Sequence, residues 1–194
     1  MQFDSLISTL SHQYYDPIVP SALTTYVGIQ HFKPDLIINA GTAGGFKMKG
    51  SAIGDVYLCS QMANHDRRIP MPGFTEYGIG NYSCSTITKI VEELNYKTGI
   101  VTTSNSLDHT EVDDVHMLKN DASVKDMEAA SIAWTAEVAK IPFFAIKVVT
   151  DIVDGDRVTQ EEFLENLAAA ASSLQAALPR VLDHVIGKPI EIFR

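Results

Sequence analysis

The sequence predicts a single α/β domain with a largely parallel central sheet. Short apolar runs alternate along the chain with longer stretches of helical spacing, which is the pattern of strand–helix–strand units. The run Asp35–Ala40 contains Leu, Ile and Ile in succession, as expected of a strand that is buried on both faces. The chain has 194 residues, of which 45% are hydrophobic and 20% charged, and this composition suits one globular domain.

The first half of the chain is expected to contain one helix, two strands and a long loop. Pro20–Phe32 carries apolar residues at helical spacing, and Asp35–Ala40 follows as the first strand. Gly54–Met62 is the second predicted strand. The prolines and glycines between His65 and Gly80 predict an irregular loop, and loops of this length are often functional.

The second half is expected to continue the alternation. The predicted elements are a helix over Ser85–Leu94, a strand over Lys97–Thr103, a short helical turn over Asp113–Leu118, a helix over Glu128–Ala139 and a strand over Phe143–Val149.

The last predicted helix has the clearest pattern. Thr159 and Glu162 have the spacing of a capping box, and Phe163 begins a run of apolar residues at helical spacing. Pro179 is expected to kink or end this helix. We divide the chain into an irregular lead-in (residues 1–16), one domain (17–187) and a C-terminal tail (188–194).

Composition and charge exclude several classes of protein. The formal net charge of −9 argues against a protein that binds the nucleic-acid backbone, which needs a basic face. No apolar run approaches the ~18 residues of a membrane span. Cys59 and Cys84 form neither a disulfide framework nor a metal-ligand spacing, so a cytoplasmic protein without a metal is expected. No phosphate loop or dinucleotide fingerprint is present either, and no cofactor is predicted.

Candidate site residues follow the predicted strands, because ligands of α/β sheets bind beyond the carboxyl ends of the strands. Gly41–Gly45 has three glycines after the first strand and would let a ligand approach the backbone; alternatively it is only a tight strand exit. Asp151 ends a buried strand, where scarce water would raise the pKa of its carboxyl and suit it to general acid catalysis. Glu128 opens a helix. Each acid could instead be a capping or first-turn residue.

The two acids and the glycine-rich segment together indicate a binding site more specifically than any one of them alone. Two carboxylates that face one cleft can hydrolyse a glycosidic bond, with one protonating the leaving group. Lys147 lies inside an apolar strand and must find a partner, since a buried ammonium is costly. His65–Arg68 is either a polar loop face or a site wall, and His109 beside Asp108 is either an acid–base pair or a surface loop residue.

Four motifs occur in an order that resembles the nucleoside phosphorylase/nucleosidase superfamily, especially the plant-type 5′-methylthioadenosine/S-adenosylhomocysteine nucleosidases. They are Asn39–Phe46 (NAGTAGGF), Lys125–Glu128 (KDME), Lys147–Gly155 (KVVTDIVDG) and Thr159–Ala168 (TQEEFLENLA). The resemblance covers Pro17–Gly187 and implies a three-layer αβα domain with a mixed central sheet, here lacking the family's first strands.

The resemblance also implies an activity and a set of site residues. The family hydrolyses the N-glycosidic bond of 5′-methylthioadenosine to adenine and methylthioribose, through an oxocarbenium-like transition state. In the family, the residue that matches Asp151 donates a proton to adenine N7. The residue that matches Glu128 binds the ribose hydroxyls, and the one that matches Met127 packs on the sugar. Further implied ligand contacts are Thr42, Leu107, Asp108, Lys125 and Asp126.

Two positions bear on the reaction type. Phosphorylases of the superfamily carry a phosphate-binding arginine where this chain has Asn39, so the resemblance favours water as the nucleophile. The family glutamate that activates this water has no counterpart in residues 1–16, which contain no glutamate. The alternatives are therefore a non-catalytic or truncated nucleoside-binding relative, such as a storage protein, and a phosphate-dependent phosphorylase. Family habit and the apolar helix over Glu128–Ala139 suggest a homodimer.

Overall fold

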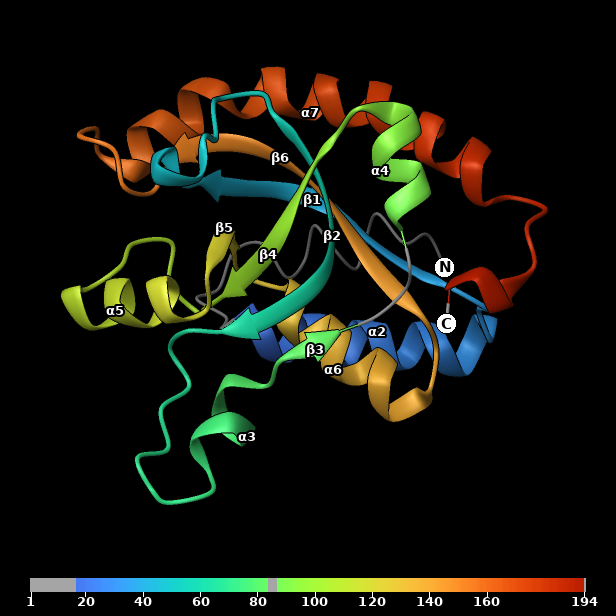
Figure 1. Ribbon diagram of the computed structural model, residues 1–194, viewed down its shortest axis with the longest axis horizontal. Coiled ribbons are helices and arrows are strands. Elements are labelled where there is room, and N and C mark those ends of the chain that lie inside the picture. The colour runs from blue at the N-terminus through green and yellow to red at the C-terminus, as the bar shows by residue number, and fades with distance from the viewer. Residues whose placement is uncertain (1–16, 84–86, 194) are drawn as a thin grey trace.

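The computed structural model describes residues 17–83 and 87–193 (Figure 1). The helices are α2 (Ile18–Phe32), α3 (Thr75–Ile79), α4 (Thr88–Leu94), α5 (Glu111–Lys119), α6 (Ala129–Ala139) and α7 (Thr159–Val185), with short 3₁₀ helices η1 (Lys47–Lys49) and η2 (Ile190–Phe193). The strands are β1 (Ile37–Gly45), β2 (Val56–Asn64), β3 (Tyr82–Ser83), β4 (Lys97–Thr103), β5 (Ala122–Asp126) and β6 (Phe143–Ile152). The predicted lead-in over residues 1–16, and Ser85 at the predicted start of a helix, lie outside the described residues.

The strands form one mixed sheet in the order β3-β2-β4-β5-β1-β6, which confirms the predicted mixed sheet. The pairs β1–β6, β2–β4 and β4–β5 are parallel, whereas β1–β5 and β2–β3 are antiparallel. In addition, Val56–Cys59 of β2 pairs antiparallel with Val148–Ala145 of β6. The sheet therefore curls back on itself, so that β6, at the end of the strand order, pairs with β2 as well as with β1.

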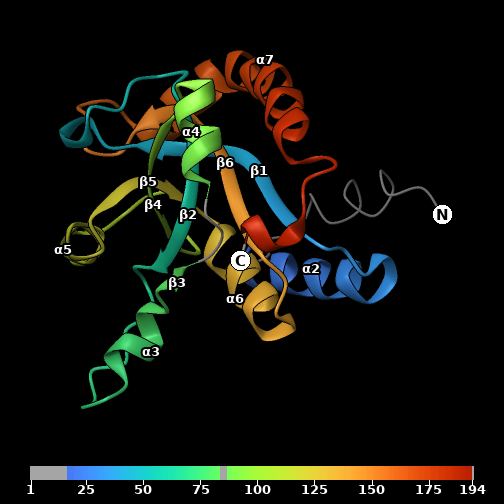
Figure 2. The same ribbon diagram turned by 45° about the vertical axis from the view of Figure 1, so that its right-hand side comes forward.

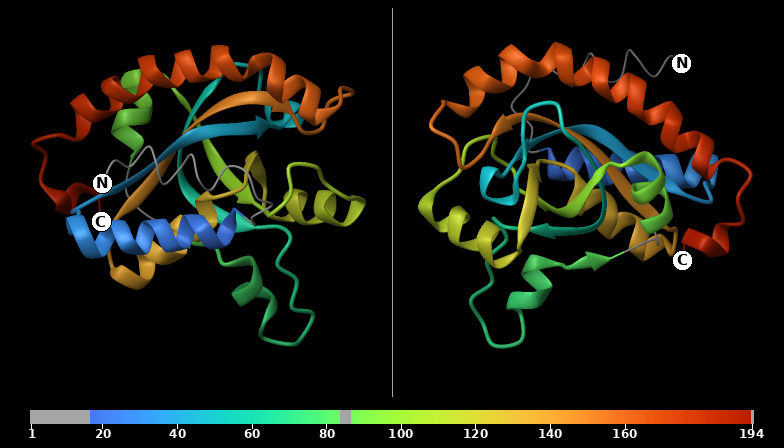
Figure 3. Two further views of the ribbon diagram at one scale, coloured as in Figure 1. Left: turned by 180° about the vertical axis from the view of Figure 1, so that it is seen from behind. Right: turned by 45° about the horizontal axis from the view of Figure 1, so that its top comes forward.

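Helices cover both faces of the sheet, as expected of three layers (Figures 1 and 2). Phe144 and Ile146 of β6 point toward α7 and α4, where they pack with Val181 and Ile90. The neighbouring Ala145 packs on the opposite face with the alanines of α6. Helix α2 lies beside α6, as both views of Figure 3 show, and the Oγ atoms of Ser21 and Ser131 lie 2.6 Å apart. The alternation of side chains along β6 thus supplies two apolar cores.

Strand β1 continues through the glycine-rich segment, so the predicted strand end at Ala40 is wrong. The glycines are required by close packing within the sheet. A Cβ added at Gly44 would lie 2.7 Å from Asp151 Oδ2, and one at Gly45 would lie 2.6 Å from the Cβ of Ser51. The pairing with β6 skips Thr150 between Ala43 and Gly44, which is a β-bulge.

Strand β5 was not predicted, because its sequence, Ala-Ser-Val-Lys-Asp, shows no strand pattern of apolar residues. All five residues are nevertheless buried, since polar groups inside the protein satisfy Lys125 and Asp126. Local sequence could not reveal those partners, which lie on other elements.

Helix α7 differs from its prediction at two points. It begins after Val158, whose side chain forms no capping hydrogen bond, so the predicted capping box of Thr159 and Glu162 is wrong. It also continues past Pro179 to Val185, so of the two predicted effects Pro179 does not end the helix. Pro179 is exposed, and so is Gln175, whose carbonyl loses its helical donor, so water can replace the missing bond.

The C-terminal residues 190–193 pack against the domain. Phe193 is buried in the same core cluster as Ala177 and Val181 of α7. Within the described residues, none of the helices combines the length and apolar character that a membrane span requires.

Candidate active site

A cavity of about 370 Å³ lies where the last residues of β1, β5 and β6 meet the start of α6 and the first turns of α7. A volume of this size suits a small molecule. Its lining residues are Thr42, Ala43, Gly44, Leu107, Lys125, Asp126, Met127, Glu128, Thr150, Asp151 and Phe163. The cavity therefore brings together all the residues predicted for the site except Asp108, which is exposed and outside the lining.

Asp151 occupies the end of β6 and is 2% exposed. Thr150 Oγ1 donates a hydrogen bond to Asp151 Oδ1 at 2.8 Å. Burial raises the pKa of the Asp151 carboxyl, and the nearby Glu162 carboxylate adds to this, while the Thr150 hydroxyl and the Lys125 ammonium act in the opposite direction. A buried carboxyl with a raised pKa, facing a cavity, can carry a proton to a bound molecule.

Lys125 connects the cavity to the loop after β4. Its Nζ donates to the carbonyl oxygens of Ser106 at 2.7 Å and Leu107 at 2.8 Å. These bonds place Leu107 as a wall of the cavity. Burial lowers the pKa of the Lys125 ammonium, and the Asp151 carboxylate is the charge that opposes this shift most strongly.

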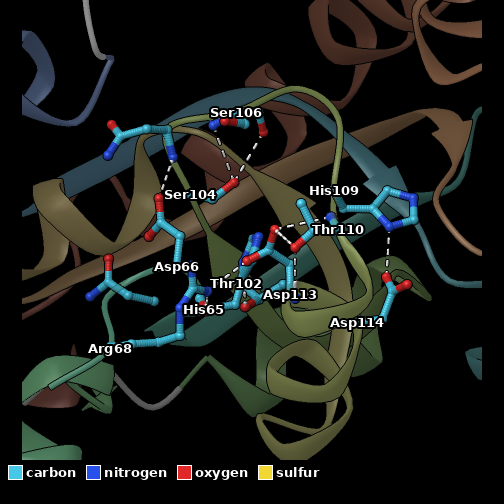
Figure 4. Close-up of polar contacts among 12 residues, drawn as sticks. His65, Asp66, Arg68, Thr102, Ser104, Ser106, His109, Thr110, Asp113 and Asp114 are labelled. Atoms are coloured by element: carbon cyan, nitrogen blue, oxygen red, sulfur yellow. Dashed lines mark hydrogen bonds and ion pairs between the residues drawn. The ribbon is translucent and has the colours of Figure 1, made fainter. Parts of the chain in front are cut away.

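Further polar contacts fasten the same loop (Figure 4). Asp66 Oδ2 accepts a hydrogen bond from the Asn105 backbone N at 2.8 Å, and Ser104 Oγ donates to Ser106 O at 3.0 Å. Asp66 and Lys125 therefore anchor the loop at Asn105, Ser106 and Leu107, which restricts how far Leu107 can move.

Asp126 and Lys147 form an ion pair inside the domain. Lys147 Nζ lies 2.8 Å from Asp126 Oδ2, and both side chains are almost completely buried. Thr103 Oγ1 donates to the other carboxylate oxygen at 2.6 Å. Lys147 therefore has the partner that its buried position predicts. Both oxygens of the Asp126 carboxylate are bound by groups of the protein itself.

The Asp126 carboxylate also fixes the start of α6. Asp126 Oδ2 accepts a hydrogen bond from Ala129 N at 2.9 Å, so it satisfies one of the free N–H groups of the first helical turn. Met127 and Glu128 lie between these two residues and line the cavity. Burial raises the pKa of the Glu128 carboxyl, and the Asp126 charge adds to this effect.

The histidines considered from the sequence lie outside the cavity lining. His65 is 1% exposed, so the alternative of a polar loop face does not describe it. Its Nδ1 lies 3.0 Å from Thr102 Oγ1 (Figure 4), and burial lowers the pKa of His65 to about 4. His109 Nδ1 lies 2.6 Å from Asp114 Oδ1 rather than pairing with Asp108.

Sequence reasoning missed two lining residues, Thr150 and Phe163, whereas Ala43 and Gly44 lie within the candidate segment Gly41–Gly45. Thr150 could have been found as the polar neighbour of Asp151 at the end of an apolar strand. Phe163 carried no such signal, because its spacing assigns it to the apolar face of α7. In the part of the chain that the structure describes, no group of three or more His, Cys, Asp or Glu side chains could hold a metal ion.

Comparisons with known proteins identify the family. Residues 12–183 match the Phosphorylase superfamily. The chain is 51% identical over 170 residues to a 5′-methylthioadenosine/S-adenosylhomocysteine nucleosidase of Arabidopsis thaliana, covering 88% of this chain and 67% of the relative. It is 46% identical to a 5′-methylthioadenosine nucleosidase of the same plant, covering 88% of this chain and 64% of the relative. The chain thus spans about two thirds of the length of these relatives.

Solved structures agree with this assignment. A crystal structure of an MTA/SAH nucleosidase superposes with a TM-score of 0.87 at 49% identity, covering 90% of this chain and 71% of the other. The apo structure of Arabidopsis thaliana 5′-methylthioadenosine nucleosidase gives a TM-score of 0.88 at 45% identity, with the same coverage. The motifs, the mixed sheet and the cavity at the strand ends therefore have one explanation, which is that this chain belongs to the phosphorylase superfamily.

Proposed function

We propose that the protein hydrolyses the N-glycosidic bond of 5′-methylthioadenosine to adenine and methylthioribose, with Asp151 as the general acid. The observation that carries this proposal is the buried Asp151 carboxyl, with its raised pKa, in one cavity with Glu128 and Met127. The names of the Arabidopsis relatives support the substrate.

In the proposed reaction Asp151 donates its proton to N7 of the adenine ring. The bond between the ring nitrogen and the sugar carbon breaks, and its electron pair leaves with the now neutral adenine. The ribose passes through an oxocarbenium-like state, water adds to the sugar carbon, and the proton that this water loses returns the Asp151 carboxylate to its acid form. A raised pKa favours the protonated form of Asp151, which this step needs.

The other lining residues bind and orient the nucleoside in this proposal. Glu128 accepts hydrogen bonds from the ribose hydroxyls, and Met127 packs on the sugar. Leu107 is a wall of the adenine pocket, whereas the exposed Asp108 lies outside the lining. Thr42 and Lys125 contribute polar contacts, whereas Asp126 acts through its bonds to Lys147 and Ala129.

Hydrolysis is favoured over phosphorolysis by the resemblance at residue 39, where phosphorylases of the superfamily carry a phosphate-binding arginine and this chain has Asn39. A phosphate dianion needs a counter-charge, and the Asn39 side chain is neutral. Within the described part of the chain, its buried Oδ1 atom has no hydrogen-bond donor. Asn39 is also outside the cavity lining.

The test is adenine release from 5′-methylthioadenosine by the purified chain, with and without phosphate. Adenine release that does not depend on phosphate would support the nucleosidase. Release only with phosphate would make the protein a phosphorylase. If the folded protein binds 5′-methylthioadenosine but releases no adenine, it is a nucleoside-binding relative. S-adenosylhomocysteine in the same assay defines the substrate range.

The proposal extends to the cellular setting and the assembly. Release of methylthioribose suits a cytoplasmic enzyme of methionine salvage, and the free thiol of buried Cys59 is compatible with a reducing compartment. A homodimer is supported by exposed apolar residues on the neighbouring helices α2 and α6, which include Leu23, Val27, Trp134 and Val138. Light scattering that gives the mass of one chain would contradict the dimer.

A further inference from the structure

The two peptide groups that flank Asp151 are both bound by side chains of α7. Glu162 Oε2 accepts a hydrogen bond from Ile152 N at 2.8 Å. Asn166 Nδ2 donates to Thr150 O at 3.0 Å. Asn166 Nδ2 also donates to the backbone carbonyl of Glu162, one helical turn earlier, at 2.9 Å, which holds the Asn166 side chain against α7.

These bonds lie where the sheet itself is interrupted. The pairing between β1 and β6 passes from Ala43–Val149 directly to Gly44–Asp151, so Thr150 is the extra residue of a bulge. A bulged residue lacks its regular ladder hydrogen bonds, and bulges near active sites redirect side chains. At this bulge Asn166 supplies the donor for the Thr150 carbonyl.

The burial of Glu162 is not explained by the stability of its own helix. Glu162 is 7% exposed, although an ionised carboxylate is costly to bury. The spacing to Thr159 predicts a capping contact, but the carboxylate instead reaches the end of β6. Its nearest cation is Arg157, whose Nη1 is 3.7 Å from Glu162 Oε1 and whose side chain is half exposed.

We propose that Glu162 and Asn166 are positioning residues, which hold the bulged segment Thr150–Ile152 so that the Asp151 carboxyl faces the nucleoside cavity. This inference rests on the proposed function of Asp151 as the acid. The charge of Glu162 has a second effect, because it adds to the raised pKa of Asp151 and so favours the protonated acid. The charged groups that face Asp151 are Lys125 from β5 and Glu162 from α7.

The experiment compares Glu162→Ala, Glu162→Gln and Asn166→Ala, with Glu161→Ala and Glu161→Gln as matched controls, since Glu161 is an exposed acid in the same helical turn. In Glu162→Ala the segment loses an anchor, and we expect kcat to fall by about 10- to 100-fold with KM changed by less than about threefold, because small misplacements of a reacting group are costly. Asn166→Ala should lower kcat by about 10-fold for the same reason.

Glu162→Gln separates placement from charge. The glutamine keeps an oxygen that accepts the Ile152 N–H, so kcat at low pH should return to within about threefold of the parent value. The missing charge should shift the alkaline limb of the kcat/KM profile to lower pH. A purely structural role predicts lower Tm values in Glu162→Ala and Asn166→Ala with unchanged kcat per folded molecule, and that result would overturn the proposal.

Hydrogen exchange at the Ile152 amide tests the inference without any activity. Exchange should accelerate in Glu162→Ala but not in Glu162→Gln or the Glu161 variants. The pKa of Asp151, measured by carboxyl-carbon NMR, should fall in Glu162→Gln. If the parent protein releases no adenine but both of these changes occur, the proposed function fails and the anchoring of the segment stands. If neither occurs, the anchoring itself is wrong.

Discussion

Gly44 on β1 and Asp151 on β6 lie opposite each other across the bulge, and a Cβ added at Gly44 would lie 2.7 Å from Asp151 Oδ2. The carboxyl group therefore occupies the volume that any other residue at position 44 would need. This relationship connects a glycine in the middle of a sheet to the group that we propose as the acid.

Gly44→Ala tests that relationship. The added methyl group must displace the Asp151 carboxyl, and we expect kcat to fall by about 10- to 100-fold. Gly28→Ala is the matched control, because nothing lies within 4 Å of a Cβ at Gly28. In the interior of α2 this change should stabilise the protein by about 0.5–1 kcal/mol without affecting kcat. Equal kcat values for the two variants would refute the steric argument.

Asp151→Asn should abolish adenine release while the protein stays folded. The amide cannot donate a carboxyl proton to adenine, and general acid catalysis contributes about 10²- to 10⁴-fold in rate. Adenine release is measured by chromatography and folding by circular dichroism. Residual activity near the parent level would remove Asp151 from its role as the acid.

The same substitution has a predictable effect on stability against pH. Because the pKa of Asp151 is raised in the folded state, the folded protein binds more protons than the unfolded chain, so the contribution of this group to stability falls as pH rises from 3.8 toward the folded pKa. An asparagine side chain at this position does not titrate. The Tm of Asp151→Asn relative to the parent should therefore increase through this pH range and then level off. A constant Tm difference would contradict the raised pKa.

Glu128→Gln should weaken the binding of the ribose. Hydrogen bonds to a charged acceptor contribute about 1.5–3 kcal/mol, so the loss of the charge should lower kcat/KM by about 10-fold or more. Steady-state kinetics with 5′-methylthioadenosine measure this effect. Unchanged values of both kcat and KM would exclude Glu128 from the site.

Lys147→Met should destabilise the domain by about 3–5 kcal/mol, because it leaves the buried Asp126 carboxylate without its cation. The double variant Lys147→Met, Asp126→Asn should regain part of this loss, since neither charge of the pair remains. Urea unfolding of the two variants gives the comparison. If the double variant is less stable than Lys147→Met, the unpaired Asp126 charge is not the cause of the lost stability.

Most of the helices and strands could be predicted from local sequence patterns, whereas most of the lining residues came from the resemblance to the superfamily. Apolar runs indicated β1, β2 and β6, because a strand that is buried on both faces has successive apolar residues, and the motifs around Glu128 and Asp151 indicated where the cavity would be. These signals are local, so a single sequence contains them.

The features that depend on a partner far along the chain emerged only from the three-dimensional packing. Strand β1 passes through its glycines because Asp151 and Ser51 occupy the neighbouring space, and β5 is a strand because Lys147, Ser106 and Leu107 satisfy its buried charges. Likewise Glu162 has a helix-capping pattern but binds the end of β6. In each case a contact between distant segments outweighs the local preference, because close packing and the pairing of buried polar groups are worth more than turn or capping propensity.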